Sequence, residues 1–161
     1  YDIENLLADI KSILVVNLNT AIAAVEAEKI AQGLPATALA PVDTTKGYFE
    51  QNWSDAILNI TPAVFFGVDE IEAIGVGPAT MERYKIFVEV ILVVSGMDVL
   101  GNTRLKRYTQ AVKRVLQNNY DRIPSASKIK IETIRPRSFI LDANTSEEMR
   151  VGGVSLTTAL A

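Results

Sequence analysis

The chain has 161 residues, of which 48% are hydrophobic and 22% are charged, which is the composition of a single folded domain. Its net charge of −3 at pH 7 provides no concentrated basic surface for tight binding of nucleic acid. Cysteine and histidine are both absent, so disulfides, thiol nucleophiles, the usual zinc sites and an imidazole general base are excluded. Most familiar enzyme sites are thereby ruled out, although an all-carboxylate metal site or a Ser–Lys pair stays open.

A long amphipathic helix is predicted from Asp2 to about Gln32. Apolar residues recur at every third or fourth position and so share one stripe: Ile3, Leu7, Ile10, Leu14, Leu18, Ile22 and Val25. Gly33 is a suitable helix stop. The N-terminus lacks the basic and apolar regions of a signal peptide, and the uncharged run 12–25 is too short to cross a bilayer. We expect the helix to cover one face of a sheet in a protein that binds no membrane.

An irregular connection, here called the arm, follows at about residues 34–61. Prolines and a glycine interrupt every periodic pattern in it, and connections of this length inside one domain are uncommon. The arm nevertheless carries Tyr48, Phe49 and Trp53, whose rings are costly to leave in water. Two interpretations remain open: the aromatic residues contact another subunit, or they pack into the core of their own chain.

Residues 63–74 and 82–94 are predicted to form a hairpin around a turn at residues 75–78. The second strand is apolar on one face and mostly apolar on the other, which is typical of a central strand covered on both sides. Gly67 in the first strand indicates a bulge or a close backbone approach. Because the first strand is followed by another strand and no helix, its Gly-x-Gly turn does not indicate a nucleotide site.

Three carboxylates crowd the end of the first strand: Asp69, Glu70 and Glu72. Asp69 and Glu70 are adjacent, so a regular strand would point them to opposite faces. No recognisable loop supplies the further oxygen ligands that a hard cation requires. We therefore expect these carboxylates to be solvated.

A second helix is predicted at residues 103–119, with an inner stripe of Leu105, Tyr108, Val112, Val115 and Leu116. Its expected outer surface is basic, with Arg104, Arg107 and Arg114 along one line and Lys106 and Lys113 along another. Such a face is commonly only solvated, but arginine also suits ion pairs with a neighbouring subunit or with DNA passing nearby.

Two more strands are predicted at residues 128–141 and 149–160, with a turn at 142–147. Pro136 cannot donate a hydrogen bond to a sheet, so it indicates an edge or a bulge there. The order of elements is helix, arm, hairpin, helix, hairpin. It predicts one α+β domain over residues 1–161, with two helices packed on one face of a four-stranded, largely antiparallel sheet.

This layout resembles that of the tail terminator (tail completion) proteins of long-tailed bacteriophages and of their relatives at the head–tail junction. The resemblance extends over most of the chain. It is carried by the N-terminal helix, the arm, the strands PAVFFGVDEIE and ERYKIFVEVILVV, a connector containing Asp98, the helix RLKRYTQAVKRVLQ and the closing VGGVSLTTALA.

The resemblance implies a structural virion protein with no catalysis and no cofactor, assembled in the host cytoplasm. It implies a ring, most simply a homo-hexamer, which caps the tail tube, stops its polymerisation and docks the head connector. DNA would pass through the ring without sequence-specific binding. Exposure arguments then favour the aromatic segment 48–53 as the contact with a neighbour or the tube. They also pair the line of Arg104, Arg107 and Arg114 with the acidic end at Asp69, Glu70 and Glu72, because a ring contact requires two complementary surfaces.

Two alternatives remain open. One is another neck component or a tail-tube protein with the same general layout. The other, from a different class, is a small pocket-binding or hydrolytic domain that uses carboxylates with Ser or Lys. A metal requirement or saturable binding of a small molecule would favour this second alternative.

Overall fold

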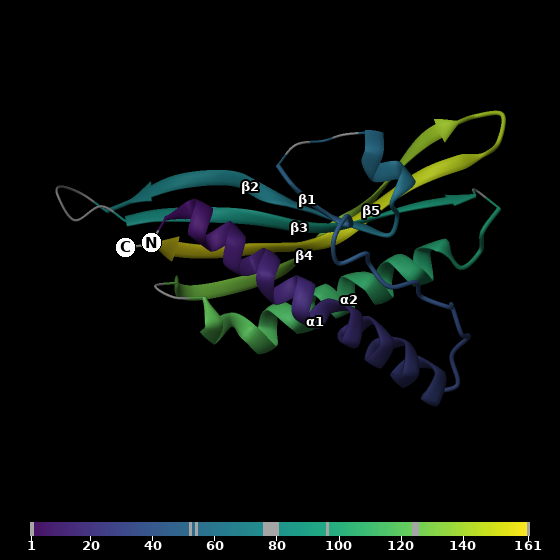
Figure 1. Cartoon of the computed structure of the whole chain (residues 1–161), viewed down its shortest axis with the longest axis horizontal. Coiled ribbons are helices and arrows are strands. Elements are labelled where there is room, and N and C mark those ends of the chain that lie inside the picture. Colours follow the sequence, from purple (N-terminus) through teal and green to yellow (C-terminus); the bar gives the residue numbers. More distant parts are fainter. Residues whose placement is uncertain are drawn as a thin grey trace.

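Two helices lie on one face of a five-stranded sheet in the computed structural model (Figure 1). The structure describes residues 2–51, 53, 55–75, 81–95, 97–123 and 126–160. Within these, the fold class predicted from the sequence, α+β with two helices, is confirmed.

Helix α1 (Ile3–Ala31) begins at a reciprocal cap, in which Asp2 and Asn5 each accept a backbone hydrogen bond from the other. It ends before Gly33, whose φ of +81° suits glycine. The predicted stripe is buried at every position except Ile3, which is half-buried. By length and composition α1 would also pass as a membrane span, a test that core helices of soluble proteins meet as well. Its apolar stripe packs in the core.

Helix α2 (Gly101–Asn119) begins two residues before its predicted start and continues into a short 3-10 turn, η2 (Tyr120–Arg122). All five residues of its predicted inner stripe are buried. Helix α2 lies close to the sheet at Gly152, where a Cβ atom would come within 3.1 Å of Leu105. Gly152 therefore allows the helix to approach the sheet backbone.

The strands are β1 (Tyr48–Glu50), β2 (Ala63–Ile74), β3 (Met81–Ser95), β4 (Ala126–Asp142) and β5 (Glu147–Leu160), in the sheet order β1-β2-β3-β5-β4. Both predicted hairpins are confirmed as antiparallel pairs, and β3 also pairs with β5 in antiparallel fashion. The predicted count of four strands is wrong, because β1 comes from the arm and pairs parallel to β2. Its three residues are too few to show a periodic pattern in the sequence.

Local irregularities fall close to where the sequence placed them. The register of β2 shifts between Val68 and Glu70, while Gly67 marks a close approach, since a Cβ atom there would lie 2.6 Å from the Gln51 side chain. Pro136 lies on the edge strand β4 within a register shift, as expected. Of the predicted turn at 75–78, the structure describes only Gly75, which has a φ of +104°. The remaining turn residues lie outside the described part of the chain.

The sheet is covered differently on its two faces. Under the helices, β3 contributes Ile86, Val88 and Val90 to the main core. On the other face, a 3-10 helix of the arm, η1 (Asp55–Asn59), buries Ile57 against Ala63 and Ile91. We call this second face the open face, because η1 covers only part of it. The expectation that β3 is covered on both sides is therefore correct for only part of its length.

Candidate assembly surfaces

The first half of the arm is fastened to the two helices. The Asn19 side chain on α1 makes two hydrogen bonds with the backbone of Val42, donating over 2.9 Å and accepting over 2.8 Å. The Tyr108 hydroxyl on α2 donates to the carbonyl of Ala40 over 2.7 Å. Satisfied backbone groups of this kind fix a segment that has no regular structure of its own.

Two of the three aromatic residues proposed as contacts pack within their own chain. Tyr48 is half-buried and donates its hydroxyl to the carbonyl of Leu14 over 3.3 Å, and burial raises the pKa of Tyr48 to about 12. Phe49 is half-buried in the smaller cluster on the open face. Trp53 is 47% exposed and contacts Phe65 edge to face, with ring centroids 6.0 Å apart. Of the three, only Trp53 is exposed.

Arg107 is buried, which corrects its placement on an exposed basic line. Its side chain is only 4% exposed, and it donates to Glu26 over 2.7 Å and to the Thr37 hydroxyl over 3.2 Å. Burial alone would raise the pKa of Glu26, but hydrogen bonds from Thr37 and Arg107 outweigh it and lower that pKa to about 2. Arg107 therefore joins α1, the arm and α2 within one chain.

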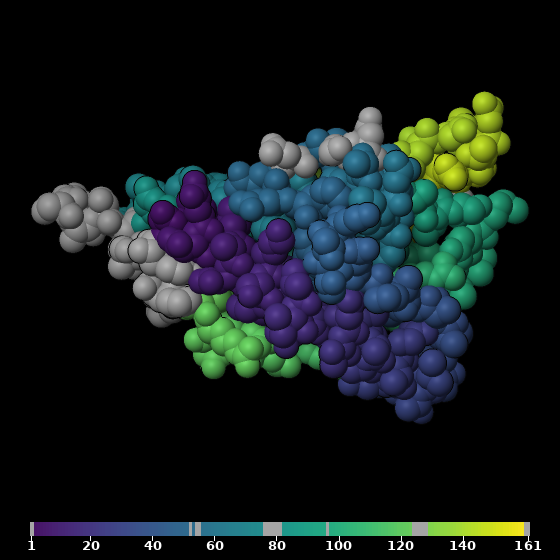
Figure 2. Space-filling model, viewed as in Figure 1, coloured from purple at the N-terminus to yellow at the C-terminus, as the bar shows by residue number. Residues whose placement is uncertain are grey.

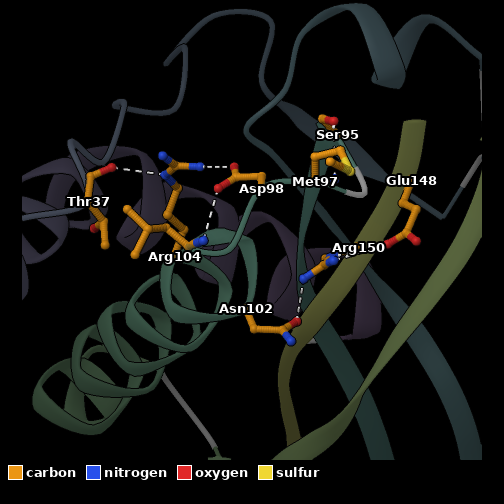
Figure 3. A network of polar contacts seen from close by, with 9 residues as sticks. Thr37, Ser95, Met97, Asp98, Asn102, Arg104, Glu148 and Arg150 are labelled. Carbon is orange, nitrogen blue, oxygen red and sulfur yellow. Dashed lines mark hydrogen bonds and ion pairs between the residues drawn. The ribbon is translucent and has the colours of Figure 1, made fainter. Parts of the chain in front are cut away.

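Arg104 and Arg114 are also paired within the chain. Arg104 donates to the carbonyl of Thr37 over 2.9 Å and pairs with Asp98, as Figure 3 shows. Arg114 makes two bonds of 2.8 Å to the carboxylate of Glu28. The expected outer line is wrong because Arg107 and Arg114 face Glu26 and Glu28 near the end of α1. Arg104 faces the arm and the β3–α2 connector. A contact of Arg104 or Arg114 with a neighbouring subunit stays a prediction.

The acidic strand end is exposed, as expected, but its geometry differs from a regular strand. Asp69 is the extra residue of the register shift, and its carboxylate lies 3.9 Å from the ammonium of Lys85, which is the residue opposite Glu70. The bulge therefore brings Asp69 and Glu70 to the same face of the sheet. Glu72 pairs with Arg83 over 3.3 Å. Nowhere in the described ranges do three acidic residues come together as a metal site.

A hollow of about 330 Å³ on the open face was missed from the sequence. Its lining includes Trp53, Phe65, Phe87 and Phe139, with Glu89 and Arg137 paired beside them. Burial raises the pKa of Glu89, and Arg137 opposes this shift. Glu89 is the one charged residue within the apolar run from Ile86 to Val94 of β3, which is a signal that sequence reading could use. Its partner on β4 follows only from the strand register.

The apolar tip is a second feature that periodicity does not reveal. We define it as Met97, Val99, Ile140 and Leu141, from the β3–α2 connector and the β4–β5 hairpin. Met97 is 84% exposed, Val99 90% and Ile140 75%. The pairing of Ser95 with Glu147 places both segments at one end of the molecule, where Figure 2 shows them projecting. Met97 and Val99 lie in an irregular connector and Ile140 and Leu141 are adjacent near the end of β4, so periodicity marks neither pair as a shared surface.

The α2–β4 groove is a third surface, of about 430 Å³, between α2 and the edge strand. Leu105, Thr109, Ile134 and Pro136 are among the residues that line it. Lys106 and Lys113, the second basic line of the sequence, also border the groove. Among the described residues, neither lysine has a carboxylate within ion-pair distance.

The chain matches no family model and no curated protein.

Proposed function

We propose that this chain is a bacteriophage tail terminator that forms a ring at the head-proximal end of the tail tube. The ring, of six subunits, ends polymerisation of the tube and joins the tail to the head connector. DNA passes through it without sequence-specific contacts. In this role the protein is structural, has no catalytic activity, and becomes part of the virion after assembly in the host cytoplasm.

The observation that carries the proposal is the apolar surface that a single chain leaves uncovered. The exposed side chains of Met97 and Val99 in the β3–α2 connector and of Ile140 near the end of β4 lie at the same end of the molecule. Grouped apolar exposure of this kind marks a contact with another protein. The order of elements, which resembles that of tail terminator proteins, also supports this function.

The surfaces assigned to partners follow from what is free in one chain. Trp53 and the aromatic hollow of the open face are the candidates for contact with the tube or the connector. The exposed acids Asp69, Glu70 and Glu72 remain candidates for a subunit contact. Arg107 is withdrawn from that contact, because its charge is satisfied inside the chain.

The test is the mass of the purified chain by light scattering after size exclusion, with negative-stain images of the same peak. We expect closed rings with a central hole, formed as concentration rises or when purified tail tube is added. A chain that stays monomeric at every concentration, and that leaves tube length unchanged, would contradict the proposal. A tube subunit, the nearest alternative, would instead polymerise into tubes.

One observation favours the alternative of a pocket-binding domain. A second hollow on the open face, of about 480 Å³, is lined by Glu89, Arg137 and Ser155. The Ser155 hydroxyl is buried and has no hydrogen-bond partner in the described structure. Saturable binding of a small molecule that is lost in Ser155→Ala and Glu89→Gln would favour this class.

A further inference from the structure

We propose that the tip of the β4–β5 hairpin in one copy of this chain packs into the α2–β4 groove of a second copy. This inference rests on the proposed ring and deepens it, because it names the two surfaces that meet between neighbouring subunits. Ile140 and Leu141 enter the groove. The acidic residues Asp142 and Glu147 beside them form ion pairs with Lys106 and Lys113 of the groove.

The groove exists because α2 covers β5 and leaves the edge strand beside it bare. Gly152 lets α2 lie close over β5, and β4 continues past the helix as the last strand of the sheet. Leu105 on the helix and Ile134 and Pro136 on the strand give the groove apolar walls. Its volume of about 430 Å³ lies in the range of pockets that enclose a drug-sized molecule, which is space for the two side chains of the tip.

The hairpin tip has the shape and chemistry of an occupant. Ile140 is 75% exposed, and Leu141 follows it at the end of β4. The hairpin projects away from both helices, so the rest of its own chain does not cover these residues (Figures 1 and 2). A projecting strand end can enter a groove that is open along an edge strand.

Charge decides which surfaces meet. Asp142 and Glu147 flank the turn of the hairpin, and neither has an ion-pair partner among the described residues. Lys106 and Lys113, two helical turns apart on α2, are likewise unpaired there. Two tips placed against each other would bring like charges together, whereas a tip in the groove brings opposite charges together. A contact between two different surfaces propagates from copy to copy, and it closes into a ring when the rotation between neighbours divides a full turn evenly.

The first test compares two exposed aliphatic residues. Ile140→Asp should raise the concentration needed for half-assembly by about tenfold or more, because it places a charge in the buried contact. Val16→Asp is the matched control, since Val16 is 70% exposed on the outer side of α1, and it should leave assembly unchanged. Equal effects of the two substitutions would overturn the proposal.

The second test uses the absence of cysteine from the chain. Chains carrying only Leu141→Cys are mixed with chains carrying only Gln110→Cys, a residue that lines the groove. Under mild oxidation, we expect disulfide-linked pairs in the mixture and none within either variant alone. Links between two Leu141→Cys chains would instead show a tip-to-tip contact and overturn the proposal.

The outcomes separate this contact from the proposed function. Rings that form normally without the mixed disulfide would overturn the contact and leave the terminator role standing. A chain that stays monomeric with and without tail tube would overturn both.

Discussion

At the scale of single residues, Glu26 is the point where α1, the arm and α2 meet. Its carboxylate accepts hydrogen bonds from the Thr37 backbone and hydroxyl and from Arg107. A buried ion pair contributes little net stability, but removal of one partner leaves the other charge buried and uncompensated. The fold therefore depends on keeping the pair complete.

Arg107→Met should lower the free energy of unfolding by about 3 kcal/mol, because it leaves Glu26 without its cation. Arg114→Met is the matched control, since the Glu28 side chain that it leaves is 49% exposed and such surface pairs contribute about 0–1 kcal/mol. Urea unfolding of both variants measures the difference. Similar losses in the two variants would contradict the buried role of Arg107.

The pH dependence of stability should carry the signature of Glu26. Its pKa is about 2 in the folded chain against an ordinary value of 4.5, so the stabilisation is complete above pH 4.5 and is lost as pH falls toward 2. Glu89 acts with the opposite sign, since burial raises its pKa and protonation favours its folded state. Unfolding followed against pH should show a shallower acid loss in Glu26→Gln than in the unchanged chain. An unaltered slope would contradict this assignment.

At the scale of elements, the arm depends on a clasp made by one side chain. Asn19 makes two hydrogen bonds with Val42, whereas the side chain of Asn17 donates to the Ile13 carbonyl of its own helix. The clasp precedes β1 and η1, so it also positions the strand and the short helix that follow it in the chain.

Asn19→Ala should release the arm and so speed limited proteolysis between Val42 and β1. It should also lower the free energy of unfolding by about 1–3 kcal/mol, because the backbone of Val42 loses its hydrogen-bond partners. Asn17→Ala should leave the arm protected, because the hydrogen bond that it removes lies within α1. Mass spectrometry of the first cleavage products decides between the two outcomes. Cleavage at equal rates would show that other contacts hold the arm.

Periodicity predicted both helices and four of the five strands to within two residues of their ends, because each is long and patterned. It failed where tertiary contacts decide. The line of Arg104, Arg107 and Arg114 looked like a solvent face because sequence spacing does not show which side of α2 meets α1. Likewise, β1 and the pairing of Glu89 with Arg137 can be predicted only when the register of the strands is known. The groove and the apolar tip also arise from the assembled sheet.

At the scale of the whole molecule, the two faces of the sheet divide two tasks. The face under α1 and α2 holds the core, while the open face keeps aromatic side chains around a hollow. Trp53 is the only tryptophan and stands at that hollow. It can therefore report whether a partner covers the open face.

Adding purified tail tube should shift the emission of Trp53 to the blue, because its half-exposed ring would leave water. The control is a chain with Trp53→Phe and Val16→Trp, which moves the reporter to the outer side of α1 and should give no shift. Fluorescence spectra before and after addition measure both. A shift in the control chain alone would place the tube on the helix side.

The outer edge of β2 has a consequence for newly made chains. Strand β1 covers that edge only along residues 64–66, and no described strand covers residues 67–74 on the same side. The unpaired N–H and C=O groups of a bare edge can pair with a strand of another chain and so promote aggregation. Asp69, Glu70 and Glu72 lie along this bare stretch and would face their own copies if two such edges met. Like charges facing one another in this way would disfavour the pairing of two such edges.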